Sequence, residues 1–108
     1  MNRPCAGEVW LVDTGYKGKT RPAVVISRSP SIADRVVYTV VIHTTAIRGS
    51  EFEVNHTNQL VKAPNGIGVF NAQGIITLGP EDFIRKVSSL NATDFNKVIS
   101  AVKRWLEL

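Results

Sequence analysis

Apolar and polar positions along the chain follow one period up to Leu90 and another period after it. Up to Leu90, short β-branched runs and polar–apolar alternation are typical of β-strands. We expect strands at residues 8–13, 22–27, 35–42, 51–54 and 84–90, and either two strands or one interrupted strand at 68–70 and 74–78. Between them we expect a loop at 14–20, polar turns at 30–34 and 64–66, and a turn or short helical bend at 79–82.

After Leu90 the apolar residues recur at steps of three and four, which is the period of an amphipathic helix. The residues on this stripe are Phe95, Val98, Ile99, Val102, Trp105 and Leu106. Asn91 or Thr93 can cap the start of the helix, where Asp94 also suits the positive end of the helix dipole. We therefore predict a mainly β fold, a small and strongly bent antiparallel sheet or barrel closed by one C-terminal helix, with Trp105 in the core.

The composition is that of one globular domain covering residues 1–108, with 44% hydrophobic and 20% charged residues. A formal net charge of +4 favours an acidic partner, either a nucleic acid or an acidic protein. The single cysteine, Cys5, excludes an internal disulfide and fits a reducing compartment. No apolar run approaches the ~20 residues of a membrane span, and the start of the sequence does not resemble a signal peptide. We expect a soluble, cytoplasmic protein that does not associate with membranes.

Arg21 stands at the mouth of a strand that its residue types mark as buried. Val24, Val25 and Ile26 are all β-branched, and Pro22, which has no N–H to give to a sheet, is confined to the first position of the strand. The proline fixes the chain direction next to Arg21, so the guanidinium points to the rim of the sheet. A guanidinium held in this way is well suited to bind a phosphate.

Two lysines, Lys17 and Lys19, lie in the loop just before this strand. A basic loop beside a phosphate-binding arginine would follow a nucleic-acid backbone and add a salt-dependent, sequence-independent part of the affinity. The alternative is that these two charges only solvate the surface.

His43 ends the β-rich run at 35–42 and is followed by two threonines. With an ordinary pKa of about 6.5, an imidazole can move protons near neutral pH. Strand alternation places His43 and Thr45 on one face and Thr44 on the other. The competing interpretation is a packed histidine whose ring nitrogen bonds to the backbone. Arg48, in the turn that follows, is a candidate for a second phosphate contact, and we expect no chemical role for His56.

Four segments, in this order, resemble the PemK/MazF family of toxin endoribonucleases. They are GEVWLVD (7–13), KTRPAVVIS (19–27), HTTAIRGS (43–50) and FNAQGIIT (70–77), and the predicted helix follows them. The third is similar to a subgroup that carries His-Thr-Thr at this place. The resemblance runs from Gly7 to the final helix. It implies an SH3-like barrel, a homodimer, cleavage of single-stranded RNA without a metal or other cofactor, and neutralisation by a cognate antitoxin.

The resemblance also implies roles for single residues. Thr20 and Arg21 belong to the family's basic motif, and Thr45 matches its active-site threonine. Thr44 is the rival of Thr45, because strand alternation allows only one of the two to face the groove.

The fourth segment departs from the family pattern at Asn71, where relatives often have an acid in or near the motif. This difference puts the role of that acid in doubt. Asn71 and Gln73 can still bind a base edge through their amides. Phe70 can either stack on a base or pack in the core.

Metal-free cleavage of RNA uses the substrate's own 2′-OH as nucleophile and gives a 2′,3′-cyclic phosphate and a 5′-OH. It needs a base, a cation for the phosphoryl oxygens and an acid for the leaving oxygen. Arg21, His43 and Thr45 are the catalytic candidates. The alternatives are a catalytically weakened homologue that binds RNA or antitoxin, a gyrase-inhibiting toxin on the same fold, and a plain SH3-like interaction module.

Overall fold

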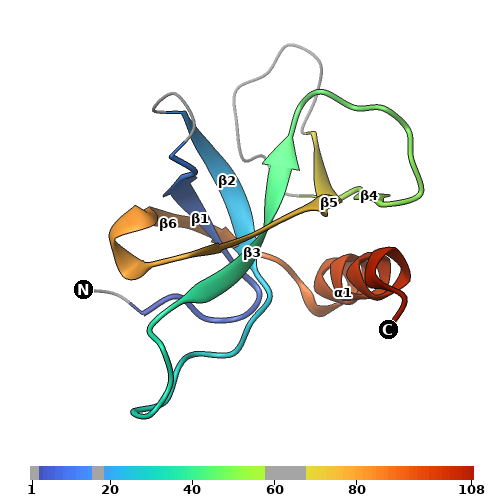
Figure 1. Cartoon of the computed structure of the whole chain (residues 1–108). Helices are drawn as coiled ribbons and strands as arrows, with labels where there is room; N and C mark the ends of the chain where they lie inside the picture. The colour runs from blue at the N-terminus through green and yellow to red at the C-terminus, as the bar shows by residue number, and fades with distance from the viewer. Residues whose placement is uncertain (1–2, 16–18, 58–67) are drawn as a thin grey trace.

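The computed structural model describes residues 3–15, 19–57 and 68–108, which form a six-stranded antiparallel sheet and a C-terminal helix (Figure 1). The strands are β1 (Glu8–Asp13), β2 (Thr20–Val25), β3 (Tyr38–Thr44), β4 (Glu53–Val54), β5 (Val69–Leu78) and β6 (Phe83–Ser89). Their order across the sheet is β4-β5-β3-β2-β1-β6. The 3-10 helix η1 (Pro80–Asp82) precedes β6, and α1 (Ala92–Leu106) follows it. The mainly β fold with a bent antiparallel sheet and a C-terminal helix, expected from the sequence, is confirmed.

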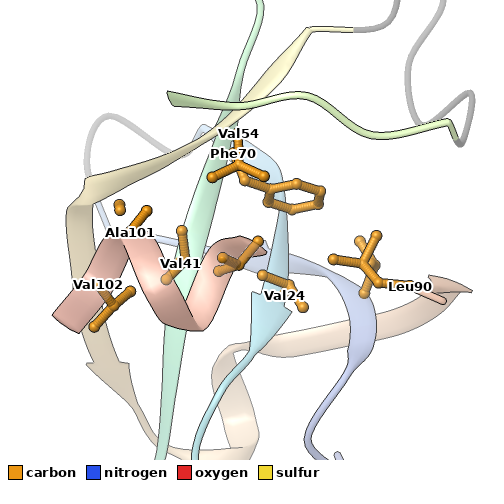
Figure 2. Packing of buried hydrophobic residues seen from close by; sticks show 10 residues of the cluster. Val24, Val41, Val54, Phe70, Leu90, Ala101 and Val102 are labelled. Carbon is orange, nitrogen blue, oxygen red and sulfur yellow. The ribbon is translucent and has the colours of Figure 1, made fainter. Parts of the chain in front are cut away.

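The sheet buries apolar side chains on both of its faces. One cluster lies between the sheet and α1, where Figure 2 shows Ala101 and Val102 of α1 beside residues of the sheet. Its sheet residues include Val9, Val24, Val41, Val54, Phe70 and Ala72. The cluster on the other face contains Trp10, Val12, Ala23, Val25, Tyr38, Val40, Leu78 and Phe83. Strand alternation sends neighbouring residues to opposite clusters, so unbroken β-branched runs such as Val24–Val25 are buried on both sides.

The helix α1 begins where the sequence indicates. Asn91 is its cap, because the Asn91 Oδ1 accepts a hydrogen bond of 2.8 Å from the backbone N–H of Asp94. The helix buries the middle of its apolar stripe, at Val98 and Val102. None of the helices in the described part of the chain has the length and apolar character needed to cross a membrane.

The predicted place of Trp105 in the core is wrong, because this residue is 43% exposed. The sheet covers the middle of the helical stripe, and Trp105 lies one turn beyond the last buried residue. Its ring instead meets Phe52 edge-on, with 5.3 Å between the ring centroids.

Two strands are shorter than expected, one is longer, and β2 starts at Thr20, two residues before the Pro22 expected to open it. Residues 35–37 and 51–52 lie outside the strands, so β3 starts at Tyr38 and β4 keeps only Glu53 and Val54. The segments 68–70 and 74–78 belong to one strand, β5, whose pairing with β3 changes register between Val41 and His43. At this irregularity the Asn71 Oδ1 accepts a hydrogen bond of 3.1 Å from the Gln73 N–H. The segment between residues 70 and 74, expected to interrupt the strand, therefore only shifts its register against β3.

Candidate functional site

A pocket of about 450 Å³ lies on the face of the sheet turned away from α1. Alternation explains this placement: Ile42 and Thr44 of β3 line the pocket, whereas Val41 packs in the cluster under α1. On β5, likewise, Asn71 and Gln73 line the pocket, whereas Phe70 and Ala72 pack in the cluster under α1. The lining residues are Arg21, Ile42, Thr44, Ala46, Arg48, Ser50, Glu53, Asn71, Gln73 and Gly74.

Two arginines bring positive charge to the pocket from separate segments. Arg21 lies near the start of β2, where its backbone pairs with Val12 of β1 and the following Pro22 pairs with Leu11. Arg48 comes from the turn between β3 and β4. Neither guanidinium forms a salt bridge within residues 3–15, 19–57 and 68–108. Both residues line the pocket, and the charge of Arg48 also interacts with the Glu53 carboxylate.

The carboxylate of Glu53 faces the same pocket from β4. Its Oε1 accepts hydrogen bonds from the N–H groups of Gly49 at 2.6 Å and Ser50 at 3.1 Å, and its Oε2 accepts one from the Arg48 N–H at 3.0 Å. These bonds, led by that from the Arg48 N–H, outweigh the effect of desolvation and lower the pKa of the Glu53 carboxyl. The carboxylate is therefore kept in its charged form.

Thr44, and not Thr45, lines the pocket. Its Oγ1 accepts a hydrogen bond of 3.0 Å from the Ala46 N–H, which leaves the hydroxyl hydrogen for donation to a ligand. Thr45 follows the end of β3, lies in a bend and is exposed. The expected position of Thr45 in the groove is thus wrong, because regular alternation stops at Thr44.

His43 does not line the pocket either, so its expected place in the groove beside the active-site threonine is wrong. Its side chain is 2% exposed and points away from the pocket, toward Phe70, with 5.2 Å between the ring centroids. The Nε2 atoms of His43 and His56 lie 3.1 Å apart, so one ring donates and the other accepts. His56, expected in a polar loop, is buried too. His43 is the packed histidine of the competing interpretation, and its Nε2 meets a second imidazole.

Gly68, which lies just before β5, leaves room for this histidine pair. Its φ of +76° suits glycine, and a Cβ at this position would lie 2.6 Å from both the His43 Cε1 and the Thr44 carbonyl oxygen. The backbone just before β5 thus approaches β3 closely at His43 and Thr44.

The remaining candidates divide between the pocket and other places. Phe70 is fully buried, so the predicted stacking of its ring on a base is wrong, and its core interpretation is confirmed. Asn71 and Gln73 line the pocket as predicted. Lys19 and Thr20 are exposed at the start of β2 but outside the pocket lining, and Lys17 lies outside the described residues.

The pocket offers guanidinium, hydroxyl and amide groups, which together suit a phosphodiester and the edge of a base. Within the described residues, no group of three His, Cys, Asp or Glu side chains is arranged to hold a metal ion. The sequence reasoning missed Glu53 and Ser50. The signal that could have found them is a carboxylate three residues after the Arg48–Ser50 turn, within reach of its N–H groups.

The bent sheet, the C-terminal helix and a pocket lined by two arginines define a small, mainly β protein. Residues 6–106 match the family described as the PemK-like, MazF-like toxin of type II toxin-antitoxin system. The chain belongs to this family. No match was found among curated proteins by sequence comparison.

Solved structures share the fold at low sequence identity. A mycobacterial endoribonuclease in complex with its cognate antitoxin is 24% identical, with a TM-score of 0.79 over 97% of this chain and 96% of that one. MazF from Deinococcus radiodurans is 24% identical, with a TM-score of 0.79 over 100% of both chains. The Mycobacterium tuberculosis toxin MazF-mt6 is 22% identical, with a TM-score of 0.71 over 94% and 97%. At this level of identity the likeness establishes the fold.

Proposed function

We propose that this toxin-family protein is a sequence-specific, metal-independent endoribonuclease that cleaves single-stranded mRNA. The observation that carries the proposal is the pocket itself, in which Arg21 of β2, Thr44 of β3 and Arg48 of the following turn converge. Similar folds in endoribonucleases support it. The proposal replaces Thr45 with Thr44 as the active-site threonine.

In the proposed reaction the 2′-oxygen of RNA bonds to phosphorus while the bond from phosphorus to the 5′-oxygen breaks. The 2′-hydroxyl proton leaves to a base, and the 5′-oxygen takes up a proton. Arg21 and Arg48 stabilise the negative charge that grows on the non-bridging oxygens, and the Thr44 hydroxyl donates to one of them. Asn71 and Gln73 contact the neighbouring base and contribute to sequence preference.

A catalytically weakened homologue that binds RNA is the second candidate. One observation favours it: His43 and His56 are buried away from the pocket, so the described part of the lining contains no imidazole. The Glu53 carboxylate is held in its charged form by backbone N–H groups and is a poor proton acceptor. Proton removal would then depend on solvent, and turnover would be slow.

The proposed partners follow from the same charges. An acidic segment of a cognate antitoxin would present carboxylates to Arg21 and Arg48 and compete with RNA for them. A homodimer is supported by the exposed apolar residues Ile32, Val36 and Val37, which a second copy would cover. We place this activity in the cytoplasm, where mRNA is available.

The test is cleavage of a transcript by the purified protein in EDTA, followed by analysis of the product ends. We expect cuts at a short recurrent sequence, with a 2′,3′-cyclic phosphate on one product and a 5′-OH on the other. A single 2′-deoxy substitution at the cut position should abolish cleavage, because it removes the nucleophile. Cleavage of the 2′-deoxy substrate, or a strict requirement for an added metal ion, would contradict the proposal. Binding without cleavage of the unmodified transcript would favour the weakened homologue.

A further inference from the structure

The turn that carries Arg48 wraps around a carboxylate. The backbone N–H groups of Arg48, Gly49 and Ser50 all donate to the Glu53 side chain, at distances of 2.6 to 3.2 Å. Gly49 makes this wrapping possible with a φ of +79°, in the left-handed region. Successive N–H groups that converge in this way form an anion-binding nest, and here the chain supplies the anion itself.

The carboxylate belongs to a strand of the sheet, whereas residues 48–50 lie outside the strands. Glu53 belongs to β4 and pairs with Asn71 of β5, which also lines the pocket. Ser50 adds two bonds to the same anchor: its carbonyl accepts from the Glu53 N–H, and its Oγ accepts from the Phe52 N–H, both at 3.2 Å. The position of the Arg48 backbone is thus set by a strand of the sheet.

Two effects of Glu53 on a bound phosphate oppose each other. Its negative charge lies in the pocket lining and repels the phosphate, whereas its hydrogen bonds keep Arg48 beside the pocket. Removing the charge alone would strengthen the binding of RNA. Releasing the turn would weaken it. When Glu53 is replaced, the sign of the change in RNA affinity therefore tells which of the two effects dominates.

We propose that Glu53 is a positioning residue that holds Arg48 at the pocket and so increases the affinity for RNA. The inference rests on the proposed function, because the ligand of Arg48 is taken to be an RNA phosphate. Glu53 acts through Arg48 and does not exchange protons with the substrate, since both of its oxygens already accept backbone N–H bonds.

The experiment combines backbone NMR with binding of an RNA that carries a 2′-deoxy nucleotide at the cut position. In the Glu53→Gln variant we expect the amide proton signals of residues 48–50 to move upfield and the affinity to fall roughly tenfold, as for one lost charge-assisted contact. Arg48→Ala should weaken binding similarly, and the double variant should bind no worse than Arg48→Ala alone. Glu51→Gln is the matched control, because it removes the same charge from a residue that pairs with Arg104 outside the pocket.

Glu53→Asp keeps the charge and shortens the reach, so its loss of affinity can come only from position. This variant also serves if Glu53→Gln does not fold. Tighter binding by Glu53→Gln, additive effects in the double variant, or unchanged amide signals would overturn the inference. A wild-type protein that binds no RNA would overturn the proposed function first, and the inference with it.

Discussion

Replacing Arg21 with alanine is expected to lower the rate of RNA cleavage by about 100- to 1000-fold, the usual loss when one donor to a developing oxyanion is removed. Arg21 is half-buried, its backbone is paired on β2, and its side chain lines the pocket beside Thr44. The interaction of its guanidinium with the phosphoryl oxygens should therefore be stronger in the transition state than in the bound substrate. The measurement is single-turnover cleavage at saturating enzyme, which isolates the chemical step from binding.

Two further variants make this result specific. Arg21→Lys keeps the charge but loses the fork of donors, so it should recover only part of the rate. Arg85→Ala removes an equal charge from an exposed position on β6, outside the pocket, and should cleave at the wild-type rate. Equal rates for Arg21→Ala and Arg85→Ala would contradict the role of Arg21.

Replacing Phe70 with alanine is expected to lower the free energy of unfolding by about 3–5 kcal/mol, as for other buried phenylalanines. Phe70 is fully buried, and its ring contacts His43 and His56 with centroid distances of 5.2 and 4.9 Å. Since typical domains unfold with about 5–15 kcal/mol, the variant should be close to unfolding. Urea denaturation followed by circular dichroism measures the loss.

The matched control is Ile84→Ala on β6, because Ile84 is 51% exposed. Its unfolding free energy should change by no more than about 0.5 kcal/mol. Under conditions in which the Phe70→Ala protein is folded, this variant should bind RNA as the wild type does. A stable Phe70→Ala protein with weakened RNA binding would instead restore the stacking role that burial argues against.

The sequence predicts well whatever depends on local chemistry. The helix and its Asn91 cap follow from a 3.6-residue period and one hydrogen-bonding side chain. Arg21 lies near a strand start and in the pocket lining, although the expected boundary is wrong: β2 begins at Thr20, so Pro22 is its third residue and not its first.

Predictions failed where the outcome depended on a strand end or on a distant partner. Alternation assigned Thr45 to the groove, but β3 ends at Thr44 and the periodic rule ends with it. Alternation does not predict what surrounds the His43 ring either. That ring meets His56, which follows β4 in the sequence. Glu53 looked like an ordinary polar position of a half-exposed strand. Its role appears only once the Arg48–Ser50 turn folds back over it.

The measurement that tests the central claim most directly is chemical-shift mapping of the wild-type protein with a single-stranded RNA made resistant by one 2′-deoxy nucleotide at the cut position. We expect the largest backbone changes at Arg21, Thr44, Arg48, Asn71 and Gln73, on the face of the sheet turned away from α1. Changes confined to the Phe52–Trp105 side, or to residues 31–37, would contradict the assignment of this pocket to RNA.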